Sequence, residues 1–516
     1  MSFSRIIIDA QVFQTDAWNR GMGRYLLALI GGIYTNNPKI DLHLVLNKNL
    51  PFDKDRQYLV KKVFENIGLE YLDFMGGPSP ESEQHNVGVL NVFVDANGLS
   101  NSLFILGSIF SFDYQPAFPS KTVNSCIFFD MIPLKNWATF HQYFPDRDYF
   151  ARFKFLYEAD TVFSISESVK NDLMSYLGFE SEDVINIDGA EIPNFLSEFQ
   201  PVDRKKSPKP YKYVLLPGGN SPHKNMLRAI RGFDIFNAHF GDTYKLLITS
   251  FYSDQNIKKM MSLSPNIELS GQVSEQDLHD LYAHAELVLF PSLDEGLGLP
   301  VLEAVGYDKK VVCSSIPIFK EISKDAFYFF DPYSPDSISN SLLDAVLDVH
   351  FLKYKKYSAI KNKFDWTRTA KVVLDSPIQR VVMQKNKKKL SIFVEQDGSS
   401  NLLKEVSKVI KQNYKSTNIY LFIDTLFEKE KRSDLLPFMF NYFIKTYDIA
   451  DAPKRSVASS KVAIYTRRSE YTYALVKKSD SQVFVDVNPK KVVTQFIASF
   501  SPENAIEASK MLEELK

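Results

Sequence analysis

The sequence predicts an α/β protein in which two doubly wound parallel sheets follow one another and a smaller α/β segment comes last. Short apolar runs alternate with segments of helical periodicity along most of the 516 residues, a pattern typical of parallel sheets covered by helices. Residues 201–210 interrupt this alternation with three prolines and four basic residues, which indicates a linker. A basic run at residues 384–389 indicates a second boundary, and a solvated linker is favoured there over a surface for lipid or nucleic acid.

The first domain is predicted at residues 1–200 and the second at residues 211–365. In the first we expect strands at 6–8, 42–46, 89–94, 125–129, 161–165 and 186–190, and helices at 24–33 and 150–159. In the second we expect strands at 213–216, 245–249, 287–290, 310–314 and 326–330, and helices at 226–236, 275–284 and 300–305. The C-terminal segment, residues 390–516, has candidate strands at 390–397, 418–424, 461–466 and 481–489. Ligands are expected at the carboxyl ends of the strands, in a cleft between the first two domains.

The composition excludes several classes of protein. A formal net charge of −1 removes the basic field of a nonspecific nucleic-acid binder, so no nucleic-acid partner is expected. The two cysteines, Cys126 and Cys313, both lie in apolar runs, which argues against a disulfide framework or a zinc ribbon. The apolar runs are too short for a membrane-spanning helix, and the first residues are typical of a buried strand rather than a signal peptide. We therefore expect a cytoplasmic protein, and any membrane association would be peripheral, on the inner face of the plasma membrane.

The most informative segment is residues 290–305, where a strand is followed by a glycine-containing loop and then by a helix. Gly296 and Gly298 permit a tight turn, and the helix that follows would present free backbone amides and its positive dipole end to an anion. Glu295 and Glu303 can both face the cleft while those amides hold a phosphate between them. A nucleotide sugar satisfies every group, although a plain glycine turn with two solvated glutamates fits the spacing alone equally well.

A second segment, residues 214–225, also runs from a strand through a glycine turn to the start of a helix. Lys224 is a mobile point charge suited to a diphosphate, and Gly218 and Gly219 let the chain approach such a group closely. A single lysine at such a position is usually a surface residue. Together with the Glu295 loop in the same domain, it indicates one shared phosphate site.

These two segments resemble the family 4 retaining glycosyltransferases of GT-B fold, and most of all the bacterial branch that builds O-antigen and capsule polysaccharides. The resemblance rests on the Glu-X7-Glu spacing from Glu295 to Glu303 and on Gly-Gly-X-X-Pro-His-Lys-Asn at residues 218–225. Three further motifs fit the same family, at residues 19–25, 129–134 and 164–168. The similarity extends over about residues 5–380.

The resemblance implies two Rossmann-like domains that face each other across a cleft, with residues 366–385 crossing back to the first domain as a helix. It implies that Glu295 holds hydroxyls of the donor sugar, Glu303 binds the ribose, and Lys224 stabilises the diphosphate leaving group. Asp130 is expected near the acceptor. The catalytic candidates are thus Glu295, Lys224 and Asp130, and the other donor-binding candidates are Gly21, Gly23, Gly218, Gly219, His223, Gly296, Leu297, Gly298 and Glu303.

Two positions depart from the family pattern. His223 stands where many relatives have arginine, which leaves a weaker and pH-dependent partner for the diphosphate. Phe129 stands before Asp130 where many relatives have histidine, which removes the basis for an imidazole role beside the anomeric carbon. A metal role for the Asp-X-Asp sequence at residues 146–148 is disfavoured, because the same pattern recurs at residues 53–55 by chance.

The predicted function is that of a retaining, metal-independent hexosyltransferase that moves a sugar from a nucleotide-sugar donor to a lipid-linked oligosaccharide, as in O-antigen or capsule assembly. GDP-mannose is the first choice of donor and a UDP-hexose the second, and no cofactor is expected. A sugar-nucleotide epimerase of GT-B fold and a degenerate transferase that acts as an assembly partner stay open. Residues 390–516 faintly resemble part of a second glycosyltransferase-like domain without a donor site. A scaffold, an oligomerisation surface and docking of other polysaccharide-assembly proteins are the roles considered for them.

Overall fold

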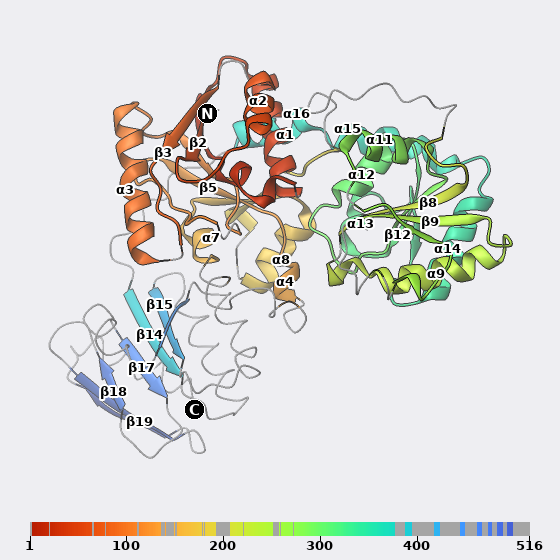
Figure 1. Cartoon of the computed structure of the whole chain (residues 1–516). Coiled ribbons are helices and arrows are strands. Elements are labelled where there is room, and N and C mark those ends of the chain that lie inside the picture. The colour runs from red at the N-terminus through yellow and green to blue at the C-terminus, as the bar shows by residue number, and fades with distance from the viewer. Residues whose placement is uncertain are drawn as a thin grey trace. The chain divides into compact units, whose positions relative to one another are not determined.

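The computed structural model describes residues 3–376 with short gaps and, beyond them, strands only (Figure 1). The gaps are residues 20, 64–66, 78, 111–112, 136–139, 141–148, 150–151, 178, 180, 192–206, 220, 251–256, 258–259 and 272. The chain forms two compact units: one comprises Met1–Thr139, Thr161–Asn171 and Glu182–Ile378, and the other comprises Phe140–Asp160, Asp172–Ser181 and Gln379–Lys516.

A parallel sheet of seven strands, in the order β3-β2-β1-β4-β5-β6-β7, occupies the N-terminal region of the chain, up to β7. The strands are β1 (Arg5–Asp9), β2 (Asp41–Asn47), β3 (Gly68–Leu72), β4 (Leu103–Leu106), β5 (Val123–Phe128), β6 (Thr161–Ser164) and β7 (Val184–Asn186). The helices between them include α1 (Gly21–Asn36), α2 (Lys54–Val63), α3 (Pro80–Ala96), α4 (Ile132–Lys135) and α8 (Glu167–Leu177). Ile6, Ile7 and Ile8 of β1 are fully buried, as expected for a central parallel strand covered on both faces. The strand order reverses between β1 and β4, which is the topological switch point of this sheet.

A second parallel sheet, of six strands in the order β10-β9-β8-β11-β12-β13, occupies the central region from β8 to α14. Its strands are β8 (Lys212–Pro217), β9 (Tyr244–Thr249), β10 (Ile267–Leu269), β11 (Leu287–Phe290), β12 (Lys310–Ser314) and β13 (Tyr328–Phe330). Helices α9 (Met226–Ala238) and α14 (Pro335–Leu347) lie on one side of this sheet, and α11 (Glu275–His284) and α12 (Leu299–Gly306) lie on the other (Figure 1). Phe233 of α9 and Ile338 of α14 pack with Val214 and Leu289 in the core beneath it. The switch point lies between β8 and β11.

Helix α15 (Tyr357–Lys363) is followed by α16 (Trp366–Leu374), which packs against α1. The side chain of Asp365 caps α16 by accepting the backbone N–H of Arg368 at 3.1 Å, and Asn36 of α1 donates to the carbonyl of Thr367 at 2.8 Å. The helix expected at residues 366–385 therefore ends earlier, at Leu374. Pro377 follows closely and disfavours helical backbone in the residue before it. Residues 377–385 lie outside the described residues.

The strand predicted at residues 89–94 is wrong, because these residues belong to α3. Ser79 begins that helix by accepting the backbone N–H of Ser82 at 3.0 Å, and a proline occupies its first turn. Leu90, Phe93 and Val94 are buried while Val92 is 70% exposed, a distribution that follows the helical repeat rather than alternation. The helix expected at 150–159 is α7 (Lys154–Glu158), and the strand expected at 186–190 is the earlier β7.

In the C-terminal segment, β14 (Lys388–Val394), β15 (Thr417–Ile423), β16 (Ile444–Asp448) and β17 (Val462–Thr466) form a parallel sheet in the order β16-β15-β14-β17. Strands β18 (Tyr473–Val476), β19 (Gln482–Asn488) and β20 (Val493–Ala498) form an antiparallel sheet. Each of the four strands predicted here matches one of these seven. Among the helices that the structure describes, none combines the length and the hydropathy that a membrane crossing requires.

Candidate active site

The loop between β11 and α12 has a backbone course that requires glycine at two positions. Gly298 has a φ of 78°, in the left-handed region, and a Cβ there would lie 2.8 Å from Cε1 of Phe319. Gly296 passes so close to the carbonyl oxygen of Phe129 that a side chain would collide with it. Pro300 lies in the first turn of α12, where a missing N–H loses no helical hydrogen bond. The backbone N–H groups of Val301 and Leu302 both donate to the carbonyl of Gly298, at 2.9 Å and 3.3 Å, so an anion at this helix start would meet the positive end of the helix dipole and the amides ahead of Val301.

Glu295 and Lys224 meet at the carboxyl ends of β11 and β8. The Lys224 ammonium lies 2.6 Å from Glu295 Oε1, and the same oxygen accepts a hydrogen bond from the Ser292 hydroxyl at 2.6 Å. Burial opposes ionisation of Glu295, but Lys224 and His223 beside it hold the pKa of the carboxyl below its usual value. The two segments, residues 214–225 and 290–305, therefore meet as predicted, with the Lys224 ammonium in contact with the Glu295 carboxylate.

Asn225 ties these two loops together. It adopts a left-handed backbone conformation with a φ of 58°, and its side-chain amide donates to the carbonyls of Pro291 at 3.1 Å and of Pro332 at 2.7 Å. The backbone N–H of Leu293 donates to the carbonyl of His223 at 2.8 Å. The relative position of Lys224 and Glu295 is thus fixed by the backbone around them.

His223 provides no charge here near neutral pH. It lies in the short turn Pro222–Lys224 that precedes α9. Burial, reinforced by repulsion from Lys224, outweighs the attraction of Glu295 and lowers the pKa of His223 to about 4. A neutral imidazole can hydrogen-bond to a ligand but cannot replace the positive charge of an arginine.

Asp130 follows β5 and lies close to the Glu295 loop. One of its carboxylate oxygens accepts the backbone N–H of Ile132 at 3.0 Å. Burial, together with repulsion from Asp294 and Glu295, raises the pKa of Asp130 to about 6. The structure therefore brings together the three catalytic candidates: Glu295, Lys224 and Asp130.

Glu303 lies in α12 and contacts Tyr282 and Arg24. Tyr282 of α11 donates its hydroxyl to Glu303 Oε2 at 3.0 Å, and Arg24 of α1 approaches Oε1 to 3.5 Å. The carboxylate is mostly buried and Arg24 is partly exposed. Arg24 was not singled out from the sequence, although it lies within the motif at residues 19–25.

The remaining glycine candidates fall into two groups. A Cβ at Gly23 would collide with the backbone of Trp18, so this glycine is required for packing within its own region. A Cβ at Gly21 would meet Leu299 of α12 at 3.8 Å, and one at Gly218 or Gly219 would meet no close neighbour. The space beside Gly218 and Gly219 is compatible with a bound ligand.

Leu297 was named for donor binding, but its side chain has a packing role. The residue is 3% exposed, and its Cδ2 packs against Gly189. A Cβ on Gly189 would lie only 2.6 Å from that atom. Leu297 can therefore offer a ligand only its backbone.

Several polar residues near the loop were missed by sequence reasoning. Lys135 lies 2.7 Å from Asp294, Ser166 donates to the carbonyl of Gly296 at 2.6 Å, and Glu321 accepts two backbone N–H groups at the start of α8. These residues are far from the loop in sequence, and no spacing rule connects them to it. Ser166 alone lies in a noted motif, at residues 164–168.

The described residues contain no cluster of three or more His, Cys, Asp or Glu side chains that could hold a metal ion. The Asp-X-Asp sequence at residues 146–148 lies outside them.

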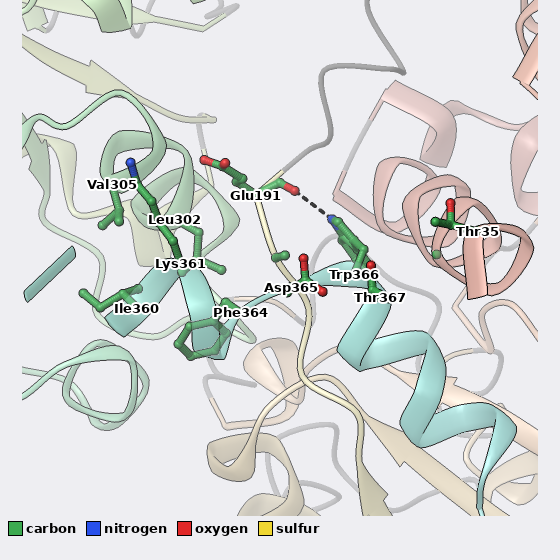
Figure 2. Close-up of a pocket in the computed structure, with 12 residues that line it drawn as sticks. Thr35, Glu191, Leu302, Val305, Ile360, Lys361, Phe364, Asp365, Trp366 and Thr367 are labelled. Atoms are coloured by element: carbon green, nitrogen blue, oxygen red, sulfur yellow. Dashed lines mark hydrogen bonds between the residues drawn. The ribbon is translucent and has the colours of Figure 1, made fainter. Parts of the chain in front are cut away.

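Figure 2 shows a separate cavity of about 330 Å³ where α16 follows α15. Leu302 and Val305 of α12 form part of its wall, and the indole N–H of Trp366 donates to the carbonyl of Glu191 at 2.7 Å. None of the predicted site residues lines this cavity. It is therefore distinct from the candidate active site.

Comparison with known proteins identifies this fold. Residues 199–363 match the family described as glycosyl transferases group 1. A glycosyltransferase from Rickettsia africae is 12% identical, with a TM-score of 0.53, and covers 72% of this chain and 96% of its own. Anabaena Alr3699/HepE, solved in complex with UDP and glucose, is 13% identical, with a TM-score of 0.53, and covers 72% and 98%. The two parallel sheets thus form the predicted GT-B fold of glycosyltransferases.

The central region of the chain thus matches the group 1 glycosyltransferases (family 4), and the chain is distantly similar to O-antigen mannosyltransferases. The serotype-specific mannosyltransferase WbdA of Escherichia coli is 24% identical over 406 residues, which cover 72% of this chain and 47% of that protein. The O-antigen chain mannosyltransferase RfbU of Salmonella typhimurium is 26% identical over 176 residues, which cover 33% and 46%. The chain spans about half the length, or less, of these curated relatives.

Proposed function

We propose that this glycosyltransferase is a retaining hexosyltransferase that moves a sugar, mannose by preference, from a nucleotide-sugar donor to a growing lipid-linked surface glycan. The observation that carries the proposal is the contact of 2.6 Å between Lys224 and Glu295 at the switch point of the second sheet. It puts a cation for a diphosphate and an acceptor for sugar hydroxyls beside the start of α12. On this proposal the protein works in the cytoplasm, at the inner face of the plasma membrane.

On this proposal, each site residue binds a different part of the donor. Lys224 and the first amides of α12 meet the diphosphate, Glu295 accepts hydrogen bonds from hydroxyls of the sugar, and Glu303 accepts them from the ribose. Gly218 and Gly219 let the backbone approach the phosphates. Asp130 lies on the side of the N-terminal region, where the acceptor is expected.

The chemistry needs charge stabilisation more than proton transfer. Departure of the nucleoside diphosphate builds negative charge on its phosphate oxygens while the anomeric carbon gains oxocarbenium character. Lys224 and the amides of α12 are oriented before the reaction begins, and such preorganised groups lower the barrier most effectively. The cavity bounded by Lys224, Glu295 and Phe319 has a volume of about 10 Å³, which is room for about one water molecule, so on this proposal the side chains move apart when a diphosphate binds.

Mannose as the sugar is supported by the names of the curated relatives, which are mannosyltransferases. A solved relative contains UDP and glucose, which supports a nucleotide-sugar donor and keeps UDP-hexoses as the second choice. The O-antigen relatives also support a surface glycan as the acceptor.

A panel of nucleotide sugars tests the proposal. The melting temperature of the purified protein is measured with GDP-mannose, UDP-glucose and other sugar nucleotides, and separate unheated samples are assayed for transfer to a lipid-linked acceptor. A ligand at 100 times its dissociation constant stabilises a protein by about 2.7 kcal/mol, which shifts the melting temperature measurably. Lys224→Met should abolish the shift.

The matched control is Lys209→Met, which breaks an ion pair of 2.5 Å with Glu268 in the same region and should leave the shift intact. A protein that no sugar nucleotide stabilises would contradict the proposal. So would conversion of a sugar nucleotide to its epimer in the absence of acceptor, which would identify an epimerase.

A further inference from the structure

We infer that two side chains of the N-terminal region, Lys135 and Ser166, position the Glu295 loop of the central region for catalysis. This pair is called the loop clamp. The inference rests on the proposed function, because it concerns the same loop, but it assigns a task to residues outside the donor-binding set. Neither residue is proposed to touch the donor, so both are positioning residues.

Ser166 fixes the residue that follows Glu295. Its hydroxyl donates to the carbonyl of Gly296 at 2.6 Å and accepts the backbone N–H of Val169 at 3.1 Å. Ser166 is completely buried, so water does not compete for either hydrogen bond. Because the carbonyl of Phe129 leaves no room for a side chain at Gly296, the backbone at this point is held from two directions.

Lys135 fixes the residue that precedes Glu295. Its ammonium lies 2.7 Å from Oδ2 of Asp294, and the other oxygen of the same carboxylate accepts the backbone N–H of Glu295 at 3.0 Å. The side chains of Lys135 and Asp294 are only 22% and 16% exposed, so solvent screens this pair less than it screens a surface pair. The lysine therefore acts on the backbone of Glu295 through Asp294.

A third contact secures the segment that carries Ser166. Both carboxylate oxygens of Glu321 accept backbone N–H groups, from Glu167 and from Ser168, at 2.8 Å each. These amides open α8, a helix of 11 residues, where a carboxylate is stabilised by the helix dipole. Glu321 lies in α13 (Pro317–Ile322), and Phe319 of the same helix packs against Gly298. The segment and the loop are thus tied to the same short helix.

The two halves of the loop therefore depend on different regions. The carboxylate of Glu295 contacts Lys224 and Ser292 of its own region, while its backbone neighbours Asp294 and Gly296 contact the N-terminal region. Loss of the loop clamp should leave the diphosphate-binding lysine in place and let the sugar-binding carboxylate move. A shift of about 1 Å in such a group typically lowers the rate by about 100-fold.

The test compares Lys135→Met and Ser166→Ala with the wild-type protein in hydrogen–deuterium exchange, nucleoside diphosphate binding and sugar transfer. In both variants, amides of residues 294–298 should exchange at least about tenfold faster while those of α9 are unchanged. The dissociation constants of GDP and UDP should stay within about twofold, and kcat for transfer should fall roughly 10- to 100-fold. Lys135→Arg should recover most of the loss, because it keeps the charge.

Lys48→Met is the matched control, since it breaks a pair of the same length, 2.7 Å with Asp73, on the exposed surface of the N-terminal region. Unchanged exchange at residues 294–298 in both variants would overturn the inference. So would a Lys135→Arg variant as impaired as Lys135→Met, or equal losses of diphosphate binding and transfer. The exchange measurement requires no donor. A failed loop clamp is therefore distinguishable from a failed proposed function, in which Glu295→Gln itself would transfer normally.

Discussion

The switch point of each sheet has a carboxylate beside it, and the two carboxylates lie in opposite environments. In the central region, Glu295 meets Lys224 at 2.6 Å and both side chains keep some exposure, 14% and 21%. In the N-terminal region, Asp9 at the end of β1 is 1% exposed, and both of its oxygens accept hydrogen bonds at 3.1 Å from Gln11. The first carboxylate has an exchangeable cation as its partner, whereas the second is satisfied by its own loop.

The pKa values of the two carboxyl groups are also shifted in opposite directions. Lys224 helps to hold the pKa of Glu295 below its usual value although burial acts against ionisation. Burial raises the pKa of Asp9 to about 6, and hydrogen bonds from Gln11 reverse only part of that rise. The charge of Glu295 is stabilised by a cation that a ligand can also contact, whereas the carboxyl of Asp9 is held by hydrogen bonds within its own loop. Topology therefore locates both loops, but only the side chains decide which of them has a chemical role.

The largest expected effect is on catalysis in the central region. Glu295→Gln and Lys224→Met should each lower transfer by about 100-fold or more, because each removes a preorganised charge from the donor site. The fold should persist, since neither side chain belongs to the apolar core. Steady-state kinetics and circular dichroism check this. Glu268→Gln, which breaks the partly buried pair with Lys209, is the control, and normal turnover in a site variant would remove the proposed site.

The second effect is on stability in the N-terminal region. The pKa of Asp9 is about 6 in the folded state against 3.8 ordinarily, so the folded protein holds this proton more tightly than the unfolded chain. The contribution of Asp9 to the free energy of unfolding is fully present below about pH 4. It is lost as the pH rises through about 6, and the loss is on the order of 2–3 kcal/mol. Asp9→Asn should remove that loss.

Denaturant unfolding at pH 4 and pH 7 measures this difference for wild type and Asp9→Asn. Taking the difference between the two proteins cancels Asp130, whose pKa is raised to the same range. If the variant lost as much stability as wild type over this interval, Asp9 would not be the group that titrates.

The fold of the central region was predictable because its strands are continuous apolar runs between turn signals. Strands β11 and β12 were predicted at the residues where the structure has them, whereas β10, with three residues, carries too little periodicity to detect. Residues 89–94 misled the prediction, because an apolar run viewed alone does not distinguish a strand from the buried face of a helix. The N-terminal cap at Ser79 was the signal that could have resolved it.

The site was predictable only in part. Lys224 and Glu295 lie in short motifs whose glycines and charges have a direct chemical meaning, so sequence alone indicated both. Lys135 and Glu321 contact the same loop or its supporting helix, but they arrive from other elements through tertiary packing. Local patterns do not encode such contacts, which become visible only when the two sheets are placed together.

A smaller effect concerns the backbone of the Glu295 loop. Gly298→Ala should destabilise the protein by more than the roughly 1–2 kcal/mol that a left-handed conformation costs alanine, because Phe319 must also move. Gly241→Ala is the matched control: Gly241 has a φ of 61° and nothing within 4 Å of its Cβ position, so it isolates the conformational part. Equal losses in denaturant unfolding would show that the contact with Phe319 contributes nothing.

The smallest expected effect is that of a chelator on transfer. If Lys224 and the amides of α12 stabilise the departing diphosphate, EDTA should change the rate by less than about twofold, because these groups supply the positive charge themselves. The control is a metal-dependent transferase assayed in the same buffer, which EDTA should inactivate. Activity that EDTA abolishes and manganese restores would bring the carboxylates of Asp146 and Asp148 back as metal ligands. The contrast between the two switch points would then be incomplete, because a bound cation would share the task assigned to Lys224 in the central region.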